Sequence, residues 1–203
     1  MKKIKTGIMG GTFNPIHMGH LLLAEWAMDF AGLDRVIFLP SGVPYQKVGK
    51  SLLDGKIRLE MVELAVSDHK KFSCSDMEIE REGYTYTYET LELFSECYPD
   101  EEFFFILGAD CLFSIEHWKC PDKIFEACTL IAAVRGDVKI HEMEKKKTEL
   151  TERFDAHIML MPFLNLDISS TNIRERVSLS KSICYLVPEN VRQYIINHAL
   201  YLS

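Results

Sequence analysis

The sequence predicts an α/β fold in which helices cover both faces of a parallel β-sheet. Short apolar runs alternate with amphipathic stretches along the whole chain of 203 residues, and this alternation is typical of a parallel sheet wound by helices. Several of the apolar runs are nearly continuous, as expected for strands that are covered on both sides. No internal repeat or Gly/Ser-rich linker interrupts the pattern. We therefore expect a single domain over residues 1–203, a Rossmann-like doubly wound sheet with a small helical part at its C-terminal end.

The expected elements follow one another in strand–helix order. The strand-like runs cover residues 3–9, 35–40, 72–80, 103–108, 129–134 and 157–161. The helical patterns between them cover residues 18–31, 54–68, 87–97, 121–127 and 139–153. The dense charge in the last of these helices predicts a solvated face, with Glu/Lys pairs four residues apart.

Two further helices are expected near the C-terminus. Asp167, Ser169 and Ser170 are typical N-cap residues, and they precede a helix that starts near Thr171. Pro188 falls in the first turn of a last amphipathic helix, whose apolar side chains have the spacing of a packed face.

Composition and charge exclude several classes of protein. The chain is 47% hydrophobic and 26% charged, and its longest apolar runs are too short to cross a bilayer, which excludes a membrane protein. The first residues lack the apolar stretch of a signal peptide, so we expect a cytoplasmic protein. The net charge of −7 argues against binding to a nucleic-acid backbone. It still permits a small anionic ligand at backbone N–H groups and helix N-termini.

The six cysteines lie far apart and include no CxxC pair. This spacing favours reduced, mostly buried thiols over a zinc site or a disulfide framework.

The segment GGTFNPIHMGH, residues 10–20, contains the first candidate site. Gly10, Gly11 and Thr12 follow the first strand, where the strand–helix turn of a wound sheet often binds phosphate. Glycine permits a tight turn and leaves backbone N–H groups accessible. The spacing fits neither GxGxxG nor GxxxxGK[ST], so we expect a phosphate-binding loop of another kind.

His17 and His20 are three residues apart, which places both on one face near a helix N-terminus. A zinc pair is one alternative, but it lacks a third ligand and the more usual spacing of four residues. Two structural histidines are the other alternative. The glycine turn directly upstream favours a functional pair.

Residues 10–20 resemble the [GT]-x-F-x-P-x-H-x-G-H signature of the nucleotidylyltransferase superfamily, and residues 168–177, ISSTNIRERV, resemble its C-terminal ISSTxIR signature. Other segments resemble the bacterial nicotinate-mononucleotide adenylyltransferases, so that the resemblance covers essentially the whole chain. Tyr45-Gln46 stands where that family usually has Pro-His, and Asn14 stands where Asp is common. The segments are LPSGVPYQK (39–47), YTYTYETL (84–91), FILGADCLFSIEHWK (105–119) and SICYLVPENVRQYI (182–195).

The resemblance implies an enzyme of NAD biosynthesis that transfers AMP from ATP to nicotinate mononucleotide, releasing deamido-NAD and pyrophosphate. A phosphate monoester has a second pKa of about 6 and is largely dianionic at neutral pH, so its attack on the α-phosphorus needs no general base. Catalysis then rests on positioning and on charge stabilisation. The resemblance assigns the catalytic roles to His17, His20 and Arg174.

The resemblance also implies two groups of binding residues and a Mg²⁺ ion that is bound mainly through the ATP phosphates, with no metal site made by the protein. Asp110 would accept a hydrogen bond from a ribose hydroxyl, and Trp118 would stack on the pyridinium ring. The ATP-binding residues are Gly10, Gly11, Thr12, Phe13, Gly108, Asp110, Ser170 and Thr171, and the substrate-binding residues are Lys47, Thr87 and Trp118.

Several alternatives stay open on the sequence alone. Taken without the resemblance, Trp118 fits a packing role, Asp110 a helix N-cap and Lys47 an exposed loop position. The substrate could be nicotinamide mononucleotide or phosphopantetheine, and the fold could serve a non-catalytic nucleotide sensor. The oligomeric state is not predicted, and a homo-oligomer is compatible with the sequence.

Overall fold

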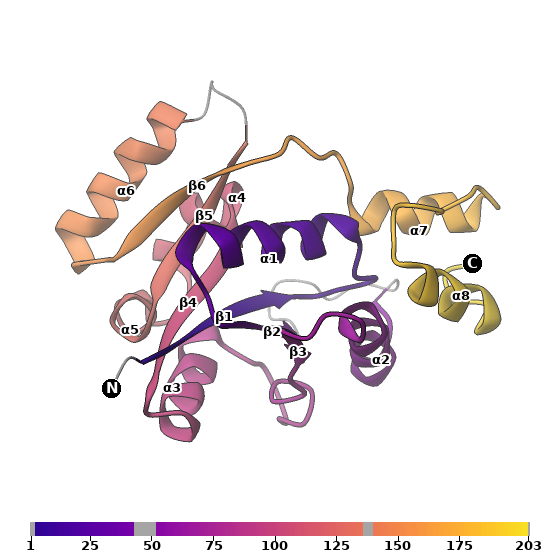
Figure 1. Ribbon diagram of the computed structural model, residues 1–203, viewed down its shortest axis with the longest axis horizontal. Coiled ribbons are helices and arrows are strands. Elements are labelled where there is room, and N and C mark those ends of the chain that lie inside the picture. The colour runs from indigo at the N-terminus through magenta and orange to yellow at the C-terminus, as the bar shows by residue number, and fades with distance from the viewer. Residues whose placement is uncertain (1–2, 43–51, 136–139, 203) are drawn as a thin grey trace.

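The computed structural model describes residues 3–42, 52–135 and 140–202. Within these residues, six strands form one parallel sheet (Figure 1). Its order is β3-β2-β1-β4-β5-β6, so the order of the strands reverses between β1 and β4. In wound sheets, ligands bind beyond the carboxyl ends of the strands at this point of reversal. The strands are β1 (Ile4–Gly11), β2 (Arg35–Pro40), β3 (Phe72–Cys74), β4 (Glu101–Gly108), β5 (Thr129–Arg135) and β6 (Ile158–Phe163).

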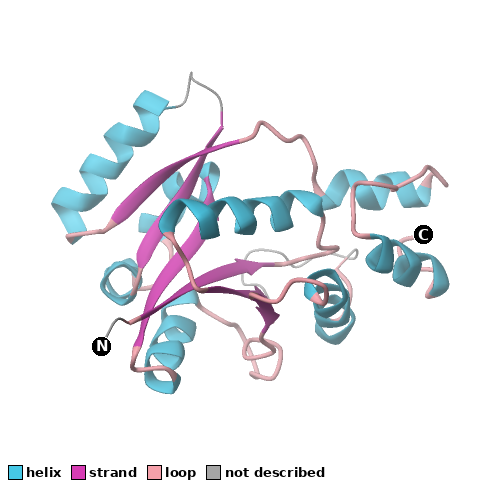
Figure 2. Cartoon of the chain, viewed as in Figure 1, coloured by secondary structure: helices cyan, strands magenta, loops and turns pink. Residues whose placement is uncertain are grey.

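Helices cover both faces of the sheet, as Figure 2 shows, and the predicted doubly wound fold is confirmed. Along β4, Phe104 and Ile106 point into one core cluster, while Phe105 and Leu107 point into the other. This alternation follows from the two-residue period of a strand. The helices are α1 (Met18–Ala31), α2 (Gly55–Val66), α3 (Thr87–Cys97), α4 (Ala109–Ser114), the 3₁₀ helix η1 (Ile115–His117), α5 (Pro121–Ala127), α6 (Ile140–Phe154), α7 (Ser170–Ser178) and α8 (Glu189–Asn197).

Three of the predicted elements need correction. The strand expected over 72–80 ends at Cys74, because the next residues curl into a turn in which the Asp76 carbonyl accepts from the N–H groups of Ile79 and Glu80. The short helices α4 and η1 were not predicted, since neither is long enough to show a helical period. Pro188 is the N-cap of α8 and lies one position before the helix.

All six cysteines are free thiols, but the expectation that most are buried is wrong. Cys128 is buried, whereas Cys97 and Cys184 are exposed and the other three are half-buried. Burial raises the pKa of the Cys128 thiol to about 12. No helix in the described part of the chain is long and apolar enough to cross a bilayer.

We expect Phe38→Ala to lower the free energy of unfolding by about 3–5 kcal/mol, because its side chain is fully buried between Phe13 and Phe72 and the change leaves a cavity. Phe30→Ala on α1 is the matched control: Phe30 is 43% exposed, and its loss should cost about 1 kcal/mol or less. Urea unfolding measures both values. Equal losses would contradict this assignment of the core.

Candidate active site

The turn after β1 is shaped by an aromatic side chain. Phe13 has a φ of 47° and is 2% exposed, and its ring lies against Gly11. A Cβ at Gly11 would lie 2.9 Å from that ring, closer than carbon atoms approach, so only glycine fits there. The backbone of the turn is therefore held at the carboxyl end of β1, beside the point where the strand order reverses.

The two histidines stack on each other at the start of α1, in the arrangement that their spacing predicted. His17 is the N-cap and His20 lies in the first turn, with ring centroids 3.7 Å apart and an interplanar angle of 23°. The backbone N–H of His17 donates to Nδ1 of His20 at 3.2 Å. A neutral His20 therefore carries its proton on Nε2, on the far side of the ring. Phe13 supports the His20 ring edge-to-face, at 5.0 Å between centroids.

The N-terminus of α7 meets the same turn from the other end of the chain (Figure 1). Ser170 Oγ donates to the carbonyl of Pro15 at 2.8 Å, and Arg174 Nη1 donates to the carbonyl of Asn14 at 2.8 Å. Arg174 Nη2 also reaches Thr171 Oγ1 at 3.4 Å. Two helix N-termini, each with a partial positive charge, thus flank one turn.

Asn14 accommodates this junction with its side chain as well as its carbonyl. Its Oδ1 accepts from the Tyr201 hydroxyl at 2.9 Å and from the N–H of Leu53 at 3.4 Å. Asn14 stands at a position where the sequence showed a departure from its family. Because an aspartate could accept the same two hydrogen bonds, the geometry explains why either residue suits the turn.

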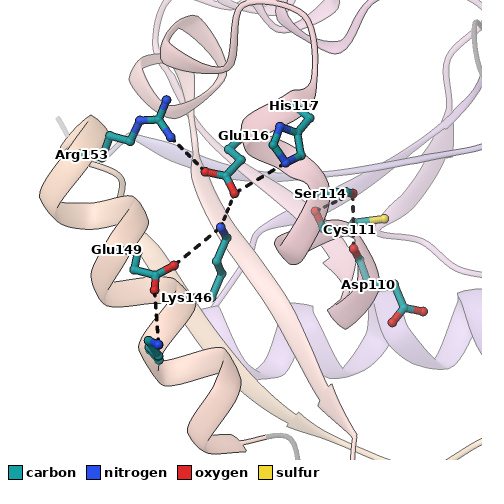
Figure 3. A network of polar contacts seen from close by, with 9 residues as sticks. Asp110, Cys111, Ser114, Glu116, His117, Lys146, Glu149 and Arg153 are labelled. Atoms are coloured by element: carbon teal, nitrogen blue, oxygen red, sulfur yellow. Dashed lines mark hydrogen bonds and ion pairs between the residues drawn. The ribbon is translucent and has the colours of Figure 1, made fainter.

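Gly108 and Asp110 lie at the carboxyl end of β4, next to β1 in the sheet. The N-cap of α4 is Gly108 and not Asp110, so the capping alternative for Asp110 is wrong. The Asp110 side chain is exposed in the first turn of α4, and Figure 3 shows its carboxylate pointing away from the charged cluster around Glu116. It is therefore placed to meet a ligand in solvent.

Thr87 and Trp118 lie on the face of the sheet that α3 and α5 cover. Thr87 is the first residue of α3, and Trp118 ends η1. The Trp118 ring packs edge-to-face on Phe105 at 6.3 Å, and the Phe105 ring lies 3.4 Å from where a Cβ of Gly10 would be. The half-buried indole thus sits at the rim of the core, one aromatic ring away from β1. Lys47 lies outside the described residues.

The charge-dense helix α6 differs from its prediction. One predicted pair four residues apart forms, Lys145 with Glu149 at 4.0 Å, but Lys146 is 12% exposed and binds Glu116 of η1 instead (Figure 3). Arg153 adds a contact to Glu116 at 3.1 Å. Lys146 holds the pKa of Glu116 below its usual value. This face of α6 is therefore an anchor for η1, two residues before Trp118, and not only a solvated surface.

Sequence reasoning missed two buried charged residues near the site, Arg58 and Glu78, which are 1% and 8% exposed. Arg58 did leave a signal, since it shares the buried face of α2 with Met61 and Val62. Glu78 left none, because it lies in the turn that follows β3. In the described residues, no group of three His, Cys, Asp or Glu side chains could hold a metal ion.

Comparison with known proteins gives a consistent picture. A family profile described as cytidylyltransferase-like matches residues 8–176. A relative from Lachnoclostridium phytofermentans, named a probable nicotinate-nucleotide adenylyltransferase, is 48% identical over 98% of this chain and 99% of its own. One of the same name from Clostridium botulinum (strain Eklund 17B) is 42% identical over 96% of both chains. The solved Plasmodium falciparum nicotinic acid mononucleotide adenylyltransferase, complexed with NaAD, shares the fold with a TM-score of 0.79 at 23% identity, covering 98% and 97% of the two chains.

We expect Lys146→Met to raise the pKa of Glu116 toward its ordinary value of 4.5, because the methionine keeps the packing of the lysine stem and removes its charge. A ¹³C NMR titration of the side-chain carboxyls measures this pKa. Lys145→Met is the control: Lys145 is 80% exposed and pairs with Glu149, so the pKa of Glu116 should not move. Equal shifts in the two variants would contradict the network in Figure 3.

Proposed function

This chain belongs to the cytidylyltransferase-like family, and from that premise we propose that it is a nicotinate-nucleotide adenylyltransferase. It transfers AMP from ATP to nicotinate mononucleotide, which gives deamido-NAD and pyrophosphate for NAD biosynthesis. The names of the relatives at 42–48% identity support this assignment. The observation that carries it is the meeting of two helix N-termini at one glycine turn, because that arrangement suits a polyphosphate.

The reaction needs charge stabilisation more than proton transfer. A phosphate oxygen of the mononucleotide attacks the α-phosphorus of ATP, and the bond from that phosphorus to the bridging oxygen of the β-phosphate breaks. The nucleophile is already largely dianionic at neutral pH, since its second pKa is about 6. The protein therefore has to align two polyanions and neutralise the charge that develops on the α-phosphate and on pyrophosphate.

We assign His17, His20 and Arg174 to that task. His20 offers its Nε2–H to the α-phosphate, since its Nδ1 already accepts from His17. The backbone from Gly10 through Phe13 supports the triphosphate. Ser170, Thr171 and Arg174 bind its outer phosphates at the N-terminus of α7, where the charge-assisted hydrogen bonds of a guanidinium are strong.

Mg²⁺ is the metal that we propose for the reaction. The donor set of the site consists of imidazoles, backbone N–H groups and a guanidinium, which bind anions and not cations. The ion would therefore be held by the ATP phosphates and water, where it would neutralise charge during the transfer.

The remaining predicted residues complete the two nucleotide sites. Asp110, with Gly108 before it, is assigned to the ribose of ATP, and Trp118 to stacking on the pyridine ring. Thr87 and Lys47 are assigned to the mononucleotide. With a net charge of −7, we propose no role for nucleic acid or a membrane surface, and we place the enzyme in the cytoplasm.

His20→Ala should lower kcat by roughly 10²–10³-fold, the usual loss for one donor to a transition state. Pyrophosphate release from ATP, Mg²⁺ and nicotinate mononucleotide measures the rate. His157→Ala is the control, because His157 directly precedes β6 at the opposite edge of the sheet and should leave kcat unchanged. A kcat within about twofold of the wild type for His20→Ala would remove this residue from the mechanism.

The ratio of kcat/KM values for nicotinate and nicotinamide mononucleotides tests the choice of substrate. A carboxylate makes stronger hydrogen bonds to N–H donors than a neutral amide does, so we expect the nicotinate substrate to be favoured by at least about tenfold. A preference for nicotinamide mononucleotide would assign the enzyme to that substrate. Binding of ATP without turnover of either would indicate a nucleotide sensor.

A further inference from the structure

Arg58 joins three segments of the chain through backbone carbonyls. It projects from α2, is 1% exposed, and donates to Thr12 at 2.7 Å, Ser41 at 2.6 Å, Gly42 at 3.1 Å and Leu53 at 3.1 Å. These acceptors belong to the turn after β1, to the end of β2 and to the segment before α2. A planar guanidinium has enough fixed donors to satisfy all of them, whereas an ammonium group does not.

Glu78 holds one of the same segments from the opposite side. The N–H of Gly42 donates to its carboxylate, which also accepts from Thr90 Oγ1 at 2.8 Å and Thr85 Oγ1 at 3.0 Å. A Cβ at Gly42 would lie 2.1 Å from the backbone carbonyl oxygen of Glu78, so no other residue fits at this approach. Burial raises the pKa of Glu78, while the hydroxyl donors favour its ionised form.

The peptide groups of Gly42 are therefore bound on both sides, the carbonyl by Arg58 and the N–H by Glu78. Gly42 leads directly into the segment that contains Lys47, and Thr85 lies two residues before Thr87. Both of these residues are assigned to the mononucleotide. Thr12, the other main acceptor of Arg58, lies in the turn assigned to ATP.

We propose that Arg58 and Glu78 are positioning residues that fix Gly42 between them and so set the affinity of the site for its two nucleotides. Glu78 acts on the mononucleotide alone, and Arg58 acts on the mononucleotide and ATP together. The inference rests on the proposed function, because it assigns each segment to one of the two substrates.

Steady-state kinetics of Glu78→Gln and Arg58→Lys test this division. Glu78→Gln keeps the shape of the side chain but loses its charge, and it should raise KM for nicotinate mononucleotide about tenfold while the KM for ATP stays within about twofold. Arg58→Lys keeps the charge but loses the fork, and it should raise both KM values about tenfold or more. In both variants kcat at saturation should change less than KM.

A merely structural role predicts a different result. Arg35→Lys is the control for that case, because Arg35 forms an ion pair with Glu101 at 2.6 Å at the opposite edge of the sheet. It should lower the melting temperature and leave both KM values unchanged. If Arg58→Lys and Glu78→Gln behave in the same way as this control, the proposal is overturned.

Amide hydrogen exchange of the unliganded protein gives a second readout that does not depend on turnover. The Gly42 N–H should exchange about fivefold faster in Glu78→Gln, because a neutral acceptor binds it more weakly than a carboxylate. If the wild type turns over no pyridine mononucleotide and Gly42 still exchanges faster, the proposed function fails while the positioning of Gly42 is supported. Unchanged exchange in both variants overturns the positioning of Gly42 whatever the activity.

Discussion

The site depends on the hydrogen bonds that Ser170 and Arg174 donate to the carbonyls of Pro15 and Asn14. They join residues 155 and 160 positions apart in the chain, and they bring the start of α7 against the turn that leads into α1. Figure 1 shows α7 and α8 beyond the carboxyl end of β1, away from the other strands. The apolar side of this unit, with Ile173 and Val191 fully buried, packs into the core cluster that α1 shares. Because packing fixes α7, its N-terminus stays aimed at the same turn in the absence of a ligand.

A chain with a net charge of −7 can still make a site for polyanions, because the local donors decide. Around the turn after β1 these donors are backbone N–H groups, two helix N-termini, two imidazoles and one guanidinium. The neighbouring groups are arranged so that they do not compete with a ligand. His20 Nδ1 is occupied by the backbone of His17, which leaves Nε2 as the donor. Asp110 is not used as a cap and stays exposed at the end of the adjacent strand β4.

The sequence predicted the fold well, because its long elements are strongly patterned. The helix over 18–31 and the strand over 35–40 have the bounds that their apolar spacing indicated. It also predicted the stacked histidines, since spacing alone places them on one face of a helix. Strand 72–80 failed because an apolar run does not reveal that the backbone of Asp76 closes a turn. The partners of Arg58, Glu78 and Lys146 were beyond reach for another reason: each depends on which distant segments meet in space, and a single sequence does not contain that information.

The central claim is that the turn after β1 and the N-terminus of α7 bind one triphosphate together. A crystal structure with a non-hydrolysable ATP analogue and Mg²⁺ tests it most directly. We expect the α-phosphate within about 3 Å of His20 Nε2, and the outer phosphates within the same distance of the Ser170 region and the Arg174 guanidinium. A triphosphate that contacts only one of the two helix N-termini, or that lies away from both, would contradict the account.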